Sequence, residues 1–290
     1  MALKPTRLWP DSATIIDRSR GVFFARWEEL LRLRRVVIKT SNQDDIHDLR
    51  VASRRVRAAL DLFYPFVAKG PKTELRKSVR ALTKILGDLR NIDEAQLFFR
   101  LRITTDRSAD KKIFYALSEL RSTELKRIQK ALTTFDHRRL DRIVRELVAE
   151  INEAAITERN SISLLAYFSE VSIRQFLPIH QLLSVSTAPG KRTARHTLRI
   201  AIKKWRYFFE IIAQVLDRDY SHTLALIKEY QALLGRMNDI AVFEGLISNL
   251  KLPPDERKHA DDALRAEDTL LLNEFSELIE QKPLTYTFLI

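Results

Sequence analysis

Cysteine is absent from this 290-residue chain, and glycine and proline are scarce, with 6 and 9 residues. The missing cysteine excludes disulfides and cysteine-ligated zinc. So few helix breakers, in a chain rich in Leu, Ala, Arg, Lys and Glu, predict an all-α protein. The sequence also lacks an apolar run of membrane-spanning length and an apolar core of the kind a secretory signal needs. We therefore expect a cytoplasmic protein that does not contact the membrane.

The charge balance is strongly basic. The formal net charge is +12, from 50 Lys and Arg against 38 Asp and Glu. A protein this basic usually binds something negative: nucleic acid, anionic lipid or phosphate. Charge alone does not choose among these partners.

Two stretches of the sequence occur twice in the same order. Residues 46–63, IHDLRVASRRVRAALDLF, resemble residues 195–212, RHTLRIAIKKWRYFFEII, with an offset of 149 from His47 to His196. LGDLRNI at 86–92 resembles LGRMNDI at 234–240, with an offset of 148 between Gly87 and Gly235. Two matches at nearly one offset predict an internal duplication. We expect a single domain made of two repeats, at about 1–150 and 151–290.

Apolar residues recur at helical spacing in both halves. Breaks are expected at Gly70-Pro71, Pro189-Gly190 and Pro253-Pro254. The predicted fold is two four-helix-bundle-like halves related by an approximate two-fold axis, with a basic groove between them. The helices are predicted at about 11–36, 43–68, 72–101, 109–134, 137–157, 160–185, 190–216, 220–249 and 255–281.

The first repeated stretch forms a helix with one basic and one apolar face. At about 100° per residue, the basic side chains share a narrow face opposite an apolar stripe. No acidic residue lies between Ala188 and Phe209, although a solvated helix face normally mixes both signs. A basic face can simply keep a protein in solution, but its repetition with a matched histidine favours binding of an external anion. The faces comprise His47, Arg50, Arg54 and Arg57, and His196, Arg199, Lys203 and Arg206.

The second repeated stretch places a glycine within a helix. Because glycine costs about 1 kcal/mol there, Gly87 and Gly235 are predicted to allow close approach of the basic helix. Asn91 and Asp239 are expected to orient the basic side chains, or to be ordinary surface or capping residues. On the same side of these helices, Arg80, Lys84 and Lys228 are expected to extend the basic groove.

Taken together, these motifs resemble the CHAD family, the conserved histidine α-helical domain. The resemblance covers nearly the whole chain and implies two helical bundles whose basic central groove binds inorganic polyphosphate, often at polyphosphate granules. Asn91 departs from the acidic residue usual there. Some relatives carry a Glu-x-Glu-x-Lys signature that this chain lacks, so hydrolysis, a catalytic residue, a metal or a cofactor is not expected. The resemblance carries a binding role to His47, Arg50, Arg54, Arg55, Arg57, His196, Arg199, Lys203, Lys204 and Arg206.

Two other functions stay open at this point. The same charges would attract the backbone of a nucleic acid, although the sequence has no clear recognition motif and no exposed aromatic platform. A phosphohydrolase would need carboxylates that hold Mg²⁺ at the phosphates, and no acidic cluster shares the basic face.

Overall fold

The computed structural model describes residues 9–102, 111–152 and 163–288. Throughout these ranges the regular structure is helical, with one short 3₁₀ turn and no strand, which confirms the predicted all-α class. No helix in this part of the chain is long and apolar enough to cross a membrane. The elements are α1 (Ser12–Thr40), α2 (Gln43–Phe63), η1 (Tyr64–Phe66), α3 (Lys69–Arg102), α4 (Lys111–Thr134), α5 (His137–Glu150), α7 (Leu164–Ser186), α8 (Arg192–Leu216), α9 (Ser221–Ser248) and α10 (Pro254–Gln281).

Polar side chains cap the helices where the sequence changes from loop to apolar periodicity. The carboxylate of Asp11 accepts a hydrogen bond from the Thr14 backbone N–H at the start of α1, at 2.8 Å. Asn42 caps α2 in the same way through the backbone N–H of Asp45. Each cap satisfies a backbone donor that the first helical turn leaves without a partner, so the caps fix where the helices begin.

Two of the three predicted breaks are confirmed. Gly190 lies between α7 and α8 with a φ of 77°, and Pro254 is the first residue of α10. The break at Gly70-Pro71 is wrong, because α3 already begins at Lys69. Proline is tolerated in the first helical turn, where its missing N–H would have no partner. The chain instead interrupts the helix earlier, at η1 and the extended residue Val67.

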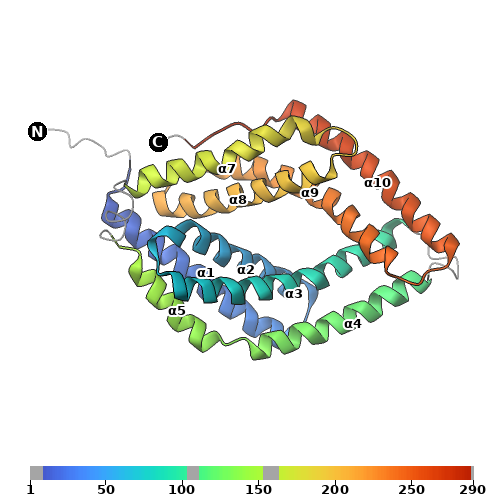
Figure 1. The fold of residues 1–290 in the computed structure, drawn as a ribbon, viewed down its shortest axis with the longest axis horizontal. Helices are drawn as coiled ribbons and strands as arrows, with labels where there is room; N and C mark the ends of the chain where they lie inside the picture. The colour runs from blue at the N-terminus through green and yellow to red at the C-terminus, as the bar shows by residue number, and fades with distance from the viewer. Residues whose placement is uncertain (1–8, 103–110, 153–162, 289–290) are drawn as a thin grey trace, which may run out of the picture.

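Successive helices pack against one another in the same order in both halves (Figure 1). In the first half α1 packs on α2, α2 on α3 and α3 on α4; in the second, α7 packs on α8, α8 on α9 and α9 on α10. Helix α5 adds to the first half by packing on α1 and α3. The halves meet where α8 contacts α1 and α2, and where α3 contacts α9. The duplication itself, and the boundary near residue 150, stay predictions.

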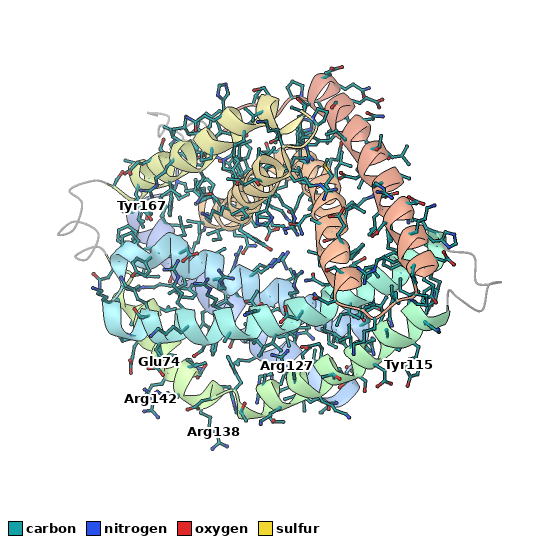
Figure 2. The ribbon with its side chains drawn as sticks, turned by 45° about the vertical axis from the view of Figure 1, so that its right-hand side comes forward. Glu74, Tyr115, Arg127, Arg138, Arg142 and Tyr167 are labelled. Carbon is teal, nitrogen blue, oxygen red and sulfur yellow. The ribbon has the colours of Figure 1, made fainter. Side chains whose placement is uncertain are left out.

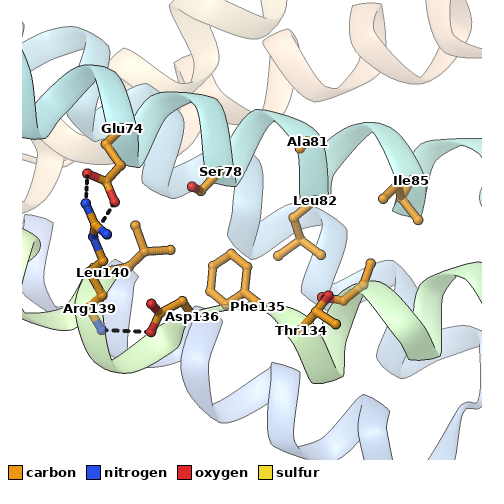
Figure 3. A pocket seen from close by; sticks show the side chains of 11 residues that line it. Glu74, Ser78, Ala81, Leu82, Ile85, Thr134, Phe135, Asp136, Arg139 and Leu140 are labelled. Carbon is orange, nitrogen blue, oxygen red and sulfur yellow. Dashed lines mark hydrogen bonds and ion pairs between the residues drawn. The ribbon is translucent and has the colours of Figure 1, made fainter.

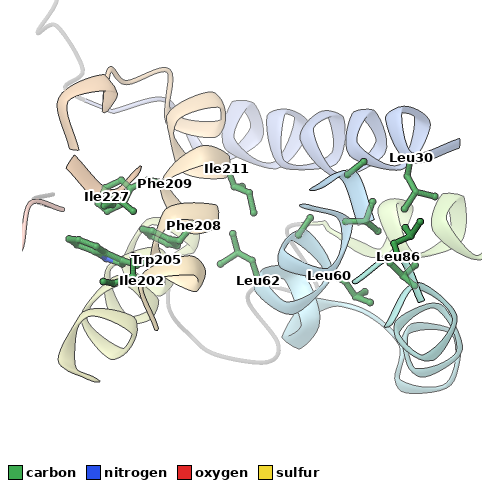
Figure 4. Packing of buried hydrophobic residues seen from close by; sticks show 14 of the residues in the cluster. Leu30, Leu60, Leu62, Leu86, Ile202, Trp205, Phe208, Phe209, Ile211 and Ile227 are labelled. Atoms are coloured by element: carbon green, nitrogen blue, oxygen red, sulfur yellow. The ribbon is translucent and has the colours of Figure 1, made fainter. Parts of the chain in front are cut away.

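A continuous apolar core holds the helices in place (Figure 4). In the first half Phe23 and Phe63 stack with ring centroids 6.2 Å apart. In the second half Trp205 packs edge-on against Phe209 at 5.0 Å. The C-terminal segment returns to this core, where Phe288 is buried against Phe209. The apolar stripes predicted for α2 and α8 therefore face the interior, and their basic faces point elsewhere.

Candidate anion-binding site

Four basic residues from the two halves influence one another where α2 lies beside α8. Arg50 and Arg54 are one turn apart on α2, and Arg199 and Lys203 are one turn apart on α8. Burial, and after it the charges of Arg54 and Arg199, lower the pKa of Arg50. The charges of Arg199, Arg54 and Arg50 also act on Lys203. We call these four residues the central cluster. Residues of both predicted basic faces thus influence one another at this junction, while the predicted basic groove itself stays a prediction.

The cations of the central cluster are partly removed from water. Burial is the largest cause that lowers the pKa of Arg50 to about 10, and it also lowers the pKa of Arg199. Lys203 is affected most, because burial and the neighbouring guanidinium groups lower its pKa to about 6. A buried cation is costly unless a counter-charge accompanies it. The protein therefore holds positive charge here at a cost to its own stability.

Several donors of these faces also lack an acceptor. In the part of the chain that the structure describes, the Nε atoms of Arg50, Arg57 and Arg199 are buried without a hydrogen-bond partner, as is Nδ1 of His47. Buried polar atoms are nearly always hydrogen-bonded, so a group of orphaned donors needs an explanation. Of these residues, Arg50 of α2 and Arg199 of α8 influence each other across the junction of the two halves.

One carboxylate, Asp239 of α9, belongs to the surroundings of Lys203. Burial raises the pKa of Asp239, while Arg199 and Lys203 lower it. The predicted orienting role of Asp239 stays a prediction. Asn91, at the matching place in the first half, is half-buried on α3 and brings no negative charge.

The two histidines have different surroundings. His47 is half-buried, and its pKa is lowered first by burial and then by the charge of Arg90. His196 is exposed, and its Nδ1 donates a hydrogen bond to Oδ1 of Asn238 at 2.7 Å. The sequence analysis did not identify Arg90 or Asn238. Arg90 directly precedes the predicted residue Asn91, and Asn238 directly precedes the predicted residue Asp239.

Arg55 and Arg206 are engaged elsewhere. Nε of Arg55 on α2 and Nε of Arg206 on α8 each bond to the Glu210 carboxylate, at 3.0 and 2.8 Å. Arg206 also donates to the side chain of Gln231 on α9 at 2.8 Å. Both arginines were predicted to bind phosphate, but the structure pairs them with a carboxylate that joins the two halves. The missed signal is Glu210 itself, the first acidic residue after the basic stretch.

The remaining predicted residues lie at the edge of the site or outside it. Arg57 is half-buried at the edge, where the charge of Arg80 acts on its guanidinium group. Burial raises the pKa of Asp88, and the charge of the exposed Lys84 partly offsets this effect. Lys204 and Lys228 are also exposed, and neither is among the charges that act on the central cluster.

The predicted role of the two glycines is wrong. A Cβ atom at Gly87 would lie 3.5 Å from Nε of Arg50, so this position faces a side chain and not a closely packed backbone. At Gly235 a Cβ atom would meet nothing within 4 Å. Neither glycine is needed to bring two helices together.

The described residues also form a cavity away from the central cluster. It has a volume of about 380 Å³ and lies between α3, α4 and α5 (Figure 3). An ion pair between Arg139 and Glu74 lies at its edge, and apolar side chains such as Leu82 and Phe135 line it. It contains none of the predicted site residues, and it has no surplus of cations to attract a polyanion.

A contact near one end of the interface also joins the halves. The hydroxyl of Tyr167 on α7 donates a hydrogen bond to the backbone carbonyl of Leu62 on α2, at 2.7 Å. Figure 2 shows Tyr167 at the start of α7, with Glu74, Arg138 and Arg142 below it in the lower left of the view. Among the described residues, no group of three or more His, Asp or Glu side chains could hold a metal ion.

Comparison with known proteins agrees with this architecture. The crystal structure of the CHAD domain from the plant Ricinus communis has a TM-score of 0.70 to this fold at 21% identity, with 99% of this chain and 98% of that chain covered. PptA from Streptomyces chartreusis has a TM-score of 0.67 at 13% identity, with 92% and 99% covered. No curated protein sequence matches the chain. The model of the CHAD domain family matches residues 22–248, most of the chain, and the protein therefore belongs to the CHAD family.

Proposed function

We propose that this protein binds inorganic polyphosphate, without catalysis, through the central cluster and the basic residues at its edge. The observation that carries the proposal is the set of buried arginine Nε atoms on both halves that have no acceptor in the described structure. Phosphate oxygens suit them because a guanidinium group can bond two oxygens at once. A basic groove between the halves, in which one chain of phosphates contacts α2 and α8 together, is part of this proposal.

A flexible chain of phosphates suits the site better than a nucleic acid. Proteins that bind single strands without sequence preference stack the bases on exposed aromatic side chains. The aromatic residues of the α8 basic stretch, Trp205, Tyr207 and Phe208, are buried, with 0%, 8% and 2% exposure. They are therefore core residues, and the site offers bases no platform.

We propose binding without hydrolysis because metal-assisted phosphoryl transfer normally uses several carboxylates to hold the ions. Asp239 is the one carboxylate among the charges acting on Lys203. A protein that binds polyphosphate in this way would also collect at polyphosphate granules in the cytoplasm. A fluorescent fusion should gather at these granules and become diffuse in cells that cannot make polyphosphate.

Titration of the purified protein with long-chain polyphosphate, DNA, RNA and short phosphates in matched salt tests the proposal. Two double variants isolate the site, because each loses two arginines. Arg50→Ala/Arg199→Ala removes cations of the central cluster, and Arg138→Ala/Arg142→Ala removes exposed cations of α5. We expect the first pair to weaken polyphosphate binding at least tenfold, and the second pair to change it little.

Several results would contradict this assignment. Equal affinity for every polyanion, or equal losses in the two double variants, would mean that only the overall charge matters. Preference for DNA or RNA at equal phosphate concentration would favour a nucleic-acid-binding protein. Metal-dependent release of phosphate, abolished by one carboxylate substitution, would indicate an enzyme.

A further inference from the structure

Lys203 is surrounded by permanent cations at the junction of the two halves. We propose that Lys203 takes up a proton when the polyanion binds, so that binding by the central cluster is coupled to pH. This inference rests on the proposed function, because it concerns the same site and the same ligand. It adds to that function a regulatory property that a purely arginine-lined site would not have.

The geometry of α2 and α8 creates the surroundings of Lys203. Arg199 lies one helical turn before it on α8, a spacing that places the two side chains next to each other. From α2, Arg50 and Arg54 act on the same ammonium group, and from α9 the carboxylate of Asp239 opposes them. Helices α2 and α9 both pack on α8. The charges of three guanidinium groups therefore act on one lysine, with a single carboxylate to offset them.

Helices α1 and α7 also pack against α8, but none of their charged residues is among the charges that act on Lys203. Arg26 of α1 faces Glu210 and Arg55. The charges of Glu170 and Arg174 on α7 act on Tyr167. The charges that decide whether Lys203 carries a proton are therefore those of α2, α8 and α9.

Lysine differs from its arginine neighbours in one chemical respect. A guanidinium group keeps its proton in proteins, whereas an ammonium group loses it readily when buried. Burial, followed by the three arginines, lowers the pKa of Lys203 to about 6. At neutral pH the ligand-free protein thus reduces its internal repulsion by releasing this proton.

A bound phosphate chain reverses this balance. Its negative charges favour the ammonium form, so the pKa of Lys203 rises on binding and a proton enters from the solvent. The affinity then falls as the pH rises from 6 towards 8, by up to about tenfold per pH unit for one proton. An arginine at this position would remain charged throughout, and its binding would not depend on pH in this range.

Calorimetric titration with long-chain polyphosphate at pH 6, 7 and 8, in buffers of different ionisation enthalpy, measures the protons taken up. Long chains are used because a terminal phosphate itself titrates near pH 6. We expect the wild type to take up close to one proton per site at pH 7 to 8. Lys203→Arg should bind with unchanged affinity from pH 6 to 8, and Lys130→Arg, at an exposed position of α4, should behave like the wild type.

His47 and His196 are the other groups of the basic faces that could titrate in this range. The variant His47→Gln/His196→Gln removes both imidazoles, and its affinity should keep the pH dependence of the wild type. Disappearance of the dependence in this variant would assign the proton to a histidine and overturn the role of Lys203.

The outcomes separate this inference from the proposed function. Tight polyphosphate binding with no proton uptake in the wild type would overturn the inference and leave the function intact. Persistence of the full pH dependence in Lys203→Arg would do the same. Absence of polyphosphate binding at every pH would overturn the function, and the inference with it.

Discussion

Glu210 offers a sharp test of how the two halves are held together. Its carboxylate accepts hydrogen bonds from Arg55 of α2 and Arg206 of α8. Burial lowers the pKa of Arg26 of α1 to about 10, and the charge of Glu210 partly offsets this effect. One side chain of the second half thus balances three cations, two of them from the first half. We expect Glu210→Ala to destabilise the protein by leaving these cations without a counter-charge.

The size of the effect follows from the exposure of each partner. The side chains of Glu210 and Arg206 are 12% and 18% exposed, so their ion pair is largely buried. Removing one partner of a buried pair costs roughly 3–5 kcal/mol. Arg55 is 42% exposed, and its pairing contributes at most about 1 kcal/mol. We therefore expect a loss of about 3 kcal/mol in the free energy of unfolding, or roughly 6 °C in Tm for a chain of this size.

Urea and thermal unfolding of Glu210→Ala beside Glu229→Ala would measure this loss. Glu229 forms an ion pair of 2.8 Å with Lys282, but both side chains are about half exposed, at 46% and 53%. The control should lose less than about 1 kcal/mol. Equal stability of the two variants would refute the reasoning, because exposure would then not decide the strength of these pairs. Polyphosphate affinity should not fall in Glu210→Ala, since the change releases Arg55 and Arg206.

Three further predictions follow from the same geometry. Gly87→Ala and Gly235→Ala should each raise the free energy of unfolding by roughly 0.5–1 kcal/mol, because both positions have room for a Cβ atom and alanine favours the helix. Lower stability of either variant in urea unfolding would show that the glycine is needed for packing. Arg50→Met should raise Tm and weaken polyphosphate binding, because the substitution replaces a buried cation among like charges by an apolar side chain. A lower Tm would mean that the central cluster stabilises the ligand-free protein. Arg199→Ala should reduce the slope of log affinity against log salt, since fewer counterions are released on binding; an unchanged slope would place Arg199 outside the contact.

The periodicity of the sequence was sufficient to predict the helices and the orientation of the basic faces. Leu49 of α2 and Trp205 of α8, which belong to the apolar stripes opposite the basic faces, are both fully buried. Periodicity could not predict which cations find partners within the protein, because those partners lie on other helices. Glu210 reaches Arg55 across 155 positions of the sequence. The role of Gly87 failed for a similar reason, since the pattern shows the missing side chain but not the Arg50 guanidinium group that lies over it.

Neighbouring residues of the basic stretches have different surroundings because one step along a helix turns the side chain by about 100°. Arg54 belongs to the central cluster, whereas Arg55 pairs with Glu210 and helps to join the halves. Arg206 lies two turns after Arg199 on the same face, and it is neutralised because Glu210 follows one turn later. On α8, Arg199 thus keeps a buried Nε without an acceptor, whereas Arg206 is held in an ion pair. Basic residues that hold the halves together and basic residues available to an anion can therefore alternate along one helix, and the number of arginines in such a stretch overstates the number that a ligand can contact.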